Sequence, residues 1–318
     1  MARPGLSPPE PSNALPSVWI VVLNRRGRAY TLDCLSAVAR VAYGRTSCVL
    51  IDNGCQDFSV EEVAQLVPGA HYLRLPVNRG FTGGVNVGIR HALAHGAHYV
   101  LLLNNDATID PDAIGELVRV ATSDTRIGIV GAKLLRRERP GRLESAGLSV
   151  ALGWGRVYQI GFGELDRGQY DATRDRTAVS GGAMLLSRAV CERIGGFDDR
   201  YFRYVEDVDV CLRARQAGFR VVFAPRARVH HTGKGMAGGR TSPLILYYSV
   251  RNHLLLMREH GAGGTLARLA RVPLICLLYV AYVISGRAGT GWPGLVAVWR
   301  GWMDYRHGIL GEAPVGDQ

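Results

Sequence analysis

Between Val18 and Leu134 the sequence alternates short apolar runs with segments of helical periodicity. Strands separated by single helices are joined by right-handed crossovers, and they form a mainly parallel sheet with helices on both faces. The pattern therefore predicts an α/β fold. Its predicted elements are strands at Val18–Leu23, Ser47–Ile51, His71–Leu75, His98–Leu103 and Ile127–Leu134, and helices at Tyr30–Arg40, Val60–Leu66, Gly84–Ala94 and Pro111–Ala121.

The rest of the chain differs in character. Residues 1–17 are proline-rich and lack a long apolar run, which predicts a disordered tail. Residues 143–176 are glycine-rich and weakly periodic, so we expect an irregular wall beside a binding site or a plain surface loop. Long apolar segments begin near residue 240, which predicts an α/β domain over 18–240 and a helical region over 241–318. Further predicted elements are a strand at Ala178–Leu186, a helix at Tyr204–Gln216 and a strand at Arg220–Phe223.

The 318-residue chain has a formal charge of +11, and Lys133 and Lys234 are its only lysines. A positive surface favours acidic partners such as nucleic acid, anionic lipid or phosphate-bearing substrates. No segment interleaves basic and aromatic residues as a nucleic-acid module would, so lipid or sugar phosphate is favoured over nucleic acid. The six cysteines show no C-x-x-C spacing and lie mostly in apolar segments. They are predicted to be reduced thiols in a reducing compartment, not zinc ligands.

Polar side chains follow the ends of three predicted strands. Asn24, Asp52 and Asp106 each come directly after an apolar run. Ligands of open α/β sheets bind beyond the carboxyl ends of the strands, so we expect these side chains to share one crevice. Asn104 and Asn105 precede Asp106, and oxygen ligands of this kind suit Mg²⁺ or Mn²⁺. Without that convergence, the Asn-Asn-Asp run would indicate only a turn.

A glycine-rich segment over residues 78–84 lets the backbone approach a ligand closely. It opens a predicted helix whose N-terminal N–H groups favour an anion. The chain contains no G-x-G-x-x-G motif, and Gly233-Lys234-Gly235 lacks the remainder of a phosphate-binding P-loop. Dinucleotide cofactors and P-loop chemistry are therefore disfavoured.

Taken in order, the motifs resemble those of the inverting family 2 glycosyltransferases with the GT-A fold, especially the rhamnosyltransferase-like branch. The resemblance covers roughly residues 18–255 and implies a Rossmann-like, mixed but mainly parallel sheet. The matching segments are Val21-Val22-Leu23-Asn24, Ile51-Asp52-Asn53-Gly54, Leu75 to Asn86, Leu103-Asn104-Asn105-Asp106, Ser180-Gly181-Gly182-Ala183, Gly195-Gly196-Phe197-Asp198, Tyr204 to Asp209 and Val229-His230-His231.

The resemblance implies a donor site and a metal site. Leu23, Asn24 and Asp52 would hold the nucleoside, because a carboxylate can accept from a base N–H or a ribose hydroxyl. Asp106 would bind Mg²⁺ or Mn²⁺ with His230, and His231 is the neighbour that could take this role instead. Asn104 and Asn105 stand where many family members carry further acids. Other implied donor-binding residues are Asn53, Asn78, Gly80, Phe81, Asn86, Asn104 and Asn105.

The Glu206-Asp207 pair corresponds to the catalytic acids of the family, with Asp207 as the expected general base. A carboxylate would remove the proton of the acceptor hydroxyl while the metal neutralises the departing diphosphate. Acids are also favoured in the first turn of any helix. Trp154, Gly181, Gly182 and Asp209 are the expected acceptor-side residues.

The implied activity is transfer of a sugar to a glycan or polyprenyl-linked acceptor. The first candidate for the donor is dTDP-rhamnose, which would supply rhamnose. One alternative is a sugar nucleotidyltransferase, since residues 24–28 superficially resemble its basic glycine-rich loop. The other is a non-catalytic scaffold that binds a nucleotide sugar at a membrane assembly.

The segment Val272–Ser285 is apolar but only 14 residues long, short of the ~20 residues that span a bilayer. Arg268 and Arg271 precede it and Arg287 follows it, as in a helix that lies on anionic lipid. With the tryptophans of 292–302, this favours peripheral attachment to the cytoplasmic face of the membrane over a helical appendage for homo-oligomerisation.

His91, His95 and His98 are spaced i, i+4, i+7, as on one face of a helix. Histidine near a helix C-terminus is stabilised by the helix dipole. We therefore interpret the three as a surface face and not as a metal site.

Overall fold

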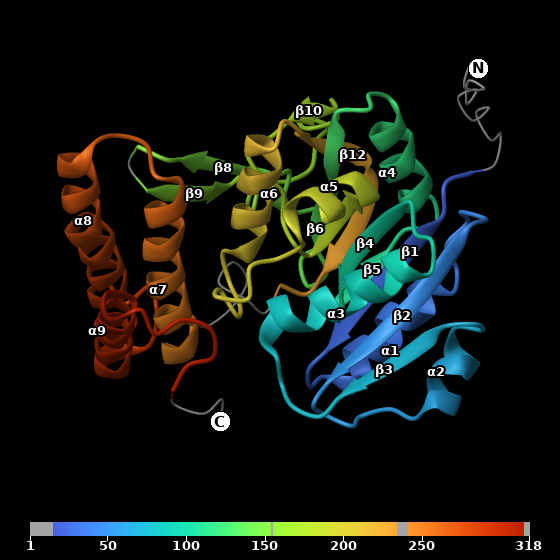
Figure 1. The fold of residues 1–318 in the computed structure, drawn as a ribbon, viewed down its shortest axis with the longest axis horizontal. Helices are drawn as coiled ribbons and strands as arrows, with labels where there is room; N and C mark the ends of the chain where they lie inside the picture. The colour runs from blue at the N-terminus through green and yellow to red at the C-terminus, as the bar shows by residue number, and fades with distance from the viewer. Residues whose placement is uncertain (1–14, 154, 234–240, 315–318) are drawn as a thin grey trace, which may run out of the picture.

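In the computed structural model, residues 15–153, 155–233 and 241–314 are described. The first half of the chain builds four parallel strands with helices between them (Figure 1). These elements match the predicted ones closely. They are β1 (Val18–Asn24), α1 (Arg28–Val38), β2 (Thr46–Asn53), α2 (Val60–Leu66), β3 (His71–Leu75), α3 (Gly80–Ala94) and β4 (Tyr99–Asn104).

The second half extends the same sheet, whose main path runs β10-β12-β6-β11-β4-β1-β2-β3. Strand β11 lies between β4 and β6 and is antiparallel to both, whereas β12 is parallel to β6. The predicted mainly parallel α/β sheet is therefore confirmed. The elements are β5 (Ala107–Ile109), α4 (Ala113–Thr122), β6 (Ile127–Arg136), β11 (Ala183–Ser187), α5 (Arg188–Ile194), α6 (Glu206–Gln216) and β12 (Arg220–His231).

Strand β12 is much longer than the predicted Arg220–Phe223. Its pairing with β6 is interrupted between Ala224 and Arg228, around Pro225, and then resumes to His231. Proline cannot donate to a strand ladder, so it is found at edges and bulges. The sequence pattern breaks at this bulge although the strand continues. Strand β11, in contrast, is shorter than predicted, because residues 178–182 are not in a strand.

Residues 143–176 contain more structure than expected. They hold β7 (Leu143–Ser145), the hairpin of β8 (Leu148–Ala151) and β9 (Arg156–Gln159), and β10 (Arg174–Asp175). The fully buried Nζ of Lys133 in β6 lies 2.9 Å from Asp166 and 2.6 Å from Asp171. Because a buried ammonium must be paired, these contacts tie the segment to the sheet.

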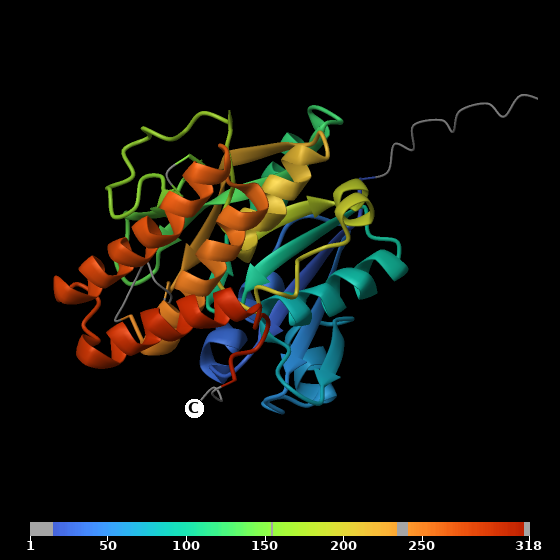
Figure 2. The same cartoon turned by 60° about the vertical axis from the view of Figure 1, so that its left-hand side comes forward.

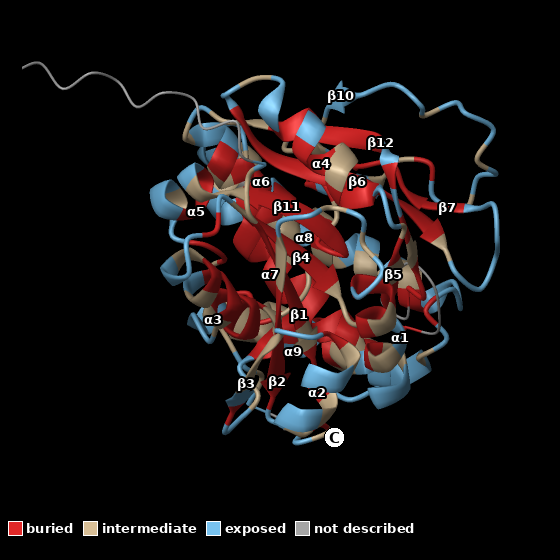
Figure 3. Cartoon of the chain, turned by 90° about the vertical axis from the view of Figure 1, so that its right-hand side faces the viewer, coloured by how far each residue is buried: buried red, intermediate tan, exposed pale blue. Residues whose placement is uncertain are grey.

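Helices cover both faces of the sheet. Val21 and Leu102 face a cluster that includes residues of α3, α5, α6 and α7, whereas Ile20 and Leu101 face α1, α2 and α4. Figure 3 shows the strands buried along most of their length. On α3, a β-carbon at Gly84 would lie only 2.4 Å from Leu23 of β1, so this helix packs unusually close to the strand. Its N-terminus is thereby brought to the carboxyl ends of the strands.

The C-terminal region is helical and consists of α7 (Pro243–His260), α8 (Thr265–Ile284) and α9 (Gly291–His307). The three stand beside the sheet domain, with α8 and α9 outermost (Figures 1 and 2). Buried residues of α7 belong to the same hydrophobic cluster as one face of the sheet. The apolar helix α8 has 20 residues, not 14, because the mixed segment before Val272 is also helical. By length and composition, it is the one helix of the described residues that could cross a membrane.

The end of the predicted disordered tail is ordered. The backbone oxygen of Ser17 accepts from the amides of His98 and Tyr99, and that of Pro16 accepts from the hydroxyl of Tyr43. Residues 1–14 lie outside the described part of the chain.

Candidate active site

A cleft of about 310 Å³ opens where β1, β2 and β4 end and α3 begins. Seven of the predicted donor-binding residues line it: Leu23, Asn53, Asn78, Gly80, Phe81, Asn104 and Asn105. Four further residues complete the wall: Arg25, Arg26, Phe202 and Arg203. The convergence of strand ends that the sequence predicts therefore forms a real cavity.

One wall of the cleft is shaped by two asparagines. Asn53 donates through Nδ2 to Asn78 Oδ1 at 3.0 Å and to the Gly80 carbonyl at 2.9 Å. Its own Oδ1 accepts from the Arg79 amide. Gly80 has φ 69°, and a β-carbon there would lie 2.5 Å from Phe202. Only glycine fits this junction of turn and helix.

The cleft is positively charged because Arg25, Arg26 and Arg203 line it. The first backbone N–H groups of α3 do not point to an anion site, in contrast to the expectation from the sequence. The amides of Phe81 and Thr82 donate to the Phe202 carbonyl, and the Gly80 amide donates to Asn78. The prediction of an anion at this helix N-terminus is wrong, since the N–H groups already have protein partners. The positive charge of the cleft comes from the arginines.

Asn24 and Asp52 lie behind the cleft instead of in its lining. The Asn24 side chain is buried between Asp57 and Thr31. The buried carboxylate of Asp52 accepts from the amides of Cys55 and Gln56 and from the Tyr72 hydroxyl. In this structure both residues hold the loops after β1 and β2 in place, and their side chains do not reach the cavity.

Asn86 also lies outside the cleft, in contrast to its predicted donor-binding role. Its Nδ2 donates to the Phe197 carbonyl and to Asp199, and its Oδ1 accepts from the Phe197 amide. Asn86 is one helical turn beyond the cleft residues and faces the loop after α5. It therefore anchors that loop to α3.

Asp106, His231 and Glu144 form a buried chain of charges next to Asn104. Asp106 Oδ1 lies 2.9 Å from His231 Nε2, and His231 Nδ1 lies 2.8 Å from Glu144 Oε1. Burial alone would lower the pKa of His231, but the hydrogen bonds and charges of Asp106 and Glu144 raise it to about 10. The site therefore stabilises positive charge. A carboxylate and an imidazole whose other nitrogen is held by a second carboxylate also fit a divalent cation.

The predicted metal ligand His230 lies elsewhere. Its Nε2 is 3.2 Å from Asp110, and both side chains are partly exposed. Successive residues of a strand face opposite sides, so only one of the two histidines of β12 can face Asp106. The structure places His231 there, which corrects the expected position.

The Glu206-Asp207 pair begins α6. Asp207 Oδ2 accepts from the Gly181 amide at 3.0 Å, while one carboxylate oxygen of Glu206 is buried without a hydrogen-bond partner. Burial raises the pKa of Asp207, although its backbone hydrogen bonds oppose the shift. Burial and then the charge of Asp207 raise the pKa of Glu206. Burial thus favours the neutral form of both acids, and the charge of Asp207 adds to this effect at Glu206.

The segment Gly181-Gly182 lies between Asp207 and the Asp106–His231 pair. A β-carbon at Gly181 would lie 3.3 Å from Asp207 and 3.8 Å from Phe81, which lines the cleft. A β-carbon at Gly182 would lie 3.8 Å from the His231 ring. Asp207 and the Asp106–His231 pair thus flank one short turn, and both lie next to the same cleft.

Asp209 does not reach this site. It is 2% exposed and lies 2.7 Å from Arg213 and 2.8 Å from His260. The turn of α6 points it away from Asp207 and toward α7, which contradicts its predicted acceptor-side role. Trp154, another predicted acceptor-side residue, lies outside the described residues.

Sequence reasoning missed the residues that support the loop before α6. Phe202, Tyr204 and Val205 all have positive φ, between 62° and 72°. This conformation is costly for β-branched and aromatic residues and persists only where the surroundings enforce it. The buried Asn252 of α7 donates to the carbonyls of Tyr201, Arg203 and Tyr204, at 2.7 to 2.9 Å. Nothing in the local sequence of α7 indicates this contact.

Comparison with known proteins gives consistent matches. The family model described as glycosyltransferase-like family 2 matches residues 16–251. The N-acetylglucosaminyl-diphospho-decaprenol L-rhamnosyltransferase of Mycobacterium tuberculosis is 28% identical over 236 residues, which are 68% of this chain and 76% of that protein. The dTDP-rhamnosyl transferase RfbF of Shigella flexneri is 25% identical over 249 residues, which are 74% of this chain and 78% of that protein.

Solved structures share the fold. The mannosyltransferase PcManGT from Pyrobaculum calidifontis, in complex with GDP-Man and Mn²⁺, matches with a TM-score of 0.54 at 16% identity over 94% of this chain and 86% of its own. Residues 1–349 of S. aureus TarS match with a TM-score of 0.56 at 12% identity over 92% of this chain and 83% of that one. The predicted GT-A architecture is thereby confirmed.

Proposed function

Since this chain belongs to the family 2 glycosyltransferases, we propose that it transfers a sugar from a nucleotide diphosphate to a lipid-linked glycan acceptor, with inversion at the anomeric carbon. The observation that carries this proposal is the turn at Gly181-Gly182. It holds Asp207 on one side and the Asp106–His231 pair on the other, beside the arginine-lined cleft.

The reaction is a single displacement. Asp207 takes the proton of the acceptor hydroxyl as its oxygen bonds to the anomeric carbon, and the bond from that carbon to the diphosphate oxygen breaks. The Gly181 amide orients the Asp207 carboxylate. Arg25, Arg26 and Arg203 bind the diphosphate, because guanidinium groups match the geometry of phosphate oxygens.

Asp106 and His231 would hold Mg²⁺ or Mn²⁺, and Glu144 would orient His231 through its Nδ1. When bound, such a cation neutralises the charge that develops on the leaving diphosphate. The donor set of one carboxylate and one imidazole leaves positions for phosphate oxygens.

The first donor to test is dTDP-rhamnose, and the first acceptor is a polyprenyl-diphosphate-linked N-acetylglucosamine. Both come from the names of the relatives above. A thermal-shift screen of dTDP, UDP and GDP with and without Mn²⁺ identifies the base, and product analysis with the matching sugar tests transfer. Metal-stimulated binding of dTDP and formation of a rhamnosylated lipid are expected. If no nucleotide diphosphate binds with or without Mn²⁺, the proposal is wrong.

The two adjacent histidines give a matched test of the metal site. His231→Gln is expected to lose most Mn²⁺-stimulated donor binding, because it removes a ligand and the partner of Asp106. His230→Gln is expected to bind as the unaltered protein does, since His230 faces Asp110. Calorimetric titration of the nucleotide with and without Mn²⁺ measures both. Equal losses in the two variants would contradict the assignment.

We further propose that the protein lies on the cytoplasmic face of the membrane through α8 and α9. An apolar groove of about 480 Å³ runs between these helices and is bordered by Leu277, Trp299 and Trp302. Leu277 is 64% exposed and Trp299 57% exposed. Tryptophan at a water–lipid boundary and a net charge of +11 both favour an anionic bilayer as the occupant. Arg287 and Arg300 are exposed nearby, whereas Arg271 is buried and cannot contact lipid.

A further inference from the structure

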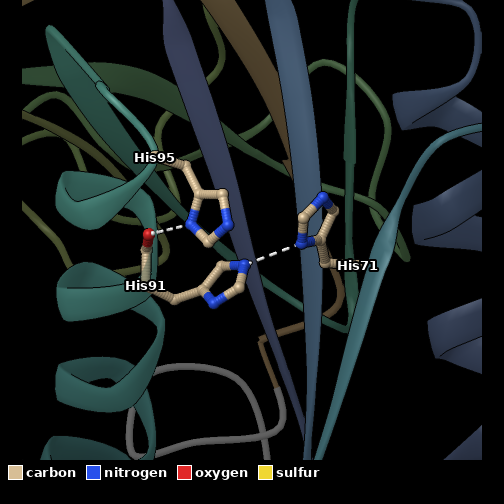
Figure 4. A group of neighbouring side chains, drawn as sticks. All are labelled: His71, His91 and His95. Atoms are coloured by element: carbon tan, nitrogen blue, oxygen red, sulfur yellow. Dashed lines mark hydrogen bonds between the residues drawn. The ribbon is translucent and has the colours of Figure 1, made fainter.

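Three histidines meet at the end of the sheet opposite the candidate active site. His71 begins β3, and His91 and His95 lie at the C-terminal end of α3, which carries Gly80 of the donor cleft at its other end. One ligand nitrogen from each histidine lies within 4.8 Å of those from the other two. Figure 4 shows the three rings pointing toward one another from the helix and the strand. His98, in contrast, is bonded to Ser17 and is not part of the cluster.

The orientation of each ring is fixed by its neighbours. His95 Nδ1 is 2.8 Å from the His91 carbonyl, which can only accept, so the proton is on Nδ1 and the lone pair is on Nε2. His91 Nε2 lies 2.8 Å from His71 Nδ1. Trp19 of β1 backs the cluster, with its ring centroid 5.0 to 5.4 Å from those of the three histidines.

We propose that His71, His91 and His95 form a second metal site, which binds one Zn²⁺ ion and is separate from the Asp106–His231 pair. Imidazole is a preferred zinc ligand, and three histidines with one open position are an established donor set. A backbone carbonyl that holds the far nitrogen of a ligand histidine, as the His91 carbonyl holds His95, is the usual outer support of such a site.

The geometry needs only small adjustments to hold the ion. With zinc–nitrogen bonds of about 2.0–2.1 Å, tetrahedral ligand nitrogens lie roughly 3.3 Å apart. The nitrogens His91 Nε2 and His71 Nδ1 are 2.8 Å apart, and the three ligand nitrogens all lie within 4.8 Å of one another. The spacing that zinc needs falls within this range. The His95 side chain is exposed, so the fourth position of the ion would be open to water.

The cluster joins two elements of the fold, the edge strand β3 and the helix α3. Bound zinc would tie the edge strand β3 to α3 and so fix the helix that supplies one wall of the donor cleft.

The test uses the untagged full-length protein after treatment with a chelator, in the His231→Gln background, which removes the catalytic cation site. Competition with a chromophoric chelator measures Zn²⁺ binding, and Co²⁺ in place of Zn²⁺ gives an absorption spectrum that reports tetrahedral nitrogen ligation. One equivalent of Zn²⁺ is expected to bind. At zinc a hundredfold above the Kd, the melting temperature is expected to rise by roughly 4 °C.

His95→Gln is the diagnostic variant because the side chain is exposed and its loss does not disturb the core. It is expected to weaken zinc binding at least roughly tenfold, since even outer partners of zinc ligands contribute that much. His98→Gln is the matched control at the same end of the sheet and is expected to bind as the background protein does. Unaltered zinc affinity in His95→Gln, or the absence of stoichiometric binding in the background protein, overturns the proposal. Both outcomes are independent of transferase activity.

Discussion

Two acids in the first turn of α6 lie in different surroundings. Asp207 is partly exposed beside the cleft and accepts from the Gly181 amide, whereas Asp209 is buried between Arg213 and His260. They are only two positions apart, but the turn of the helix directs them to opposite sides. One is suited to proton transfer, and the other holds α6 against α7.

The variants Asp207→Asn and Asp209→Asn should therefore separate activity from stability. Asp207→Asn is expected to lower kcat by roughly 10²- to 10⁴-fold with an unchanged melting temperature and unchanged donor binding, because only the base is lost. Asp209→Asn is expected to lose about 3 kcal/mol of unfolding free energy, because it leaves the partly buried guanidinium of Arg213 without its carboxylate. Rate assays and denaturant titrations check both. A similar effect of the two substitutions on both quantities would contradict the assignment.

The pH dependence of sugar transfer follows from the Glu206-Asp207 pair. A base must be ionised to accept a proton, and burial raises the pKa of Asp207. The acid limb of the kcat/KM profile is thus expected above the usual aspartate value of about 4, with activity lost as the pH falls through it. Glu206→Gln should leave this limb nearly in place, because the pKa of Asp207 is raised by burial and not by the charge of Glu206. An acid limb below pH 4 would show that Asp207 is not the titrating base.

Residue types along the strand ends sufficed to predict most of the cleft, since parallel strands bring their carboxyl ends together. They did not suffice to choose between His230 and His231. That choice depends on the phase of β12 after the bulge at Pro225, and a bulge shifts which residues face which side of the sheet. Likewise, Asn24 and Asp52 match the family motif, yet in the structure their side chains are engaged by neighbouring loops.

At the level of elements, the loop of residues 201–205 is held from two sides. The Phe202 carbonyl accepts from the first N–H groups of α3, and Asn252 of α7 binds three other carbonyls of the loop. The fully buried guanidinium of Arg251 adds a contact to the Tyr201 carbonyl and stacks on Tyr248. The loop delivers Arg203 to the cleft and Asp207 to the start of α6.

Asn252→Ala is expected to reduce kcat by roughly 10- to 100-fold, because displacement of catalytic groups by about 1 Å costs this much. Zinc binding at the distal cluster should not change. Arg258→Ala, on the exposed face of the same helix, is the control and should keep full activity. Steady-state kinetics with both variants provide the measurement. An active Asn252→Ala enzyme would show that the loop keeps its conformation without α7.

Regular elements were predictable where the apolar pattern was strong, as in β1 to β4 and α1 to α3. The short strands β7 to β10 were not, because each has only two to four residues and little alternation. The contact of α7 with the loop before α6 depends on packing between segments that are distant in sequence. Periodicity carries no information about such packing.

At the scale of the whole molecule, an apolar surface on α8 and α9 adjoins a catalytic domain that is positively charged. The two helices that border the groove lie on the side of the molecule away from α2 (Figure 1). A lipid-linked acceptor would be presented at a bilayer, so attachment through these helices would keep the enzyme near its substrate.

The variant Leu277→Glu/Trp299→Glu is expected to lower partition onto vesicles of anionic lipid at least roughly tenfold, since two large apolar contacts are lost and negative charge is added. Transfer to a water-soluble acceptor analogue should be unchanged. Val60→Glu, on α2 and 58% exposed, is the control. Vesicle flotation at low salt measures partition. If the unaltered protein does not float with the vesicles, the groove does not bind a bilayer.

The position of β11 has a consequence for how the protein is made. During synthesis, β4 can pair with β1 at once, but it emerges from the ribosome long before β11, which borders its other side in the finished sheet. Until that strand arrives, the nascent chain displays an apolar edge with open backbone groups, which invites aggregation. Fragments that end before Ala183 should therefore precipitate or bind chaperones, whereas the complete chain protects this edge from within.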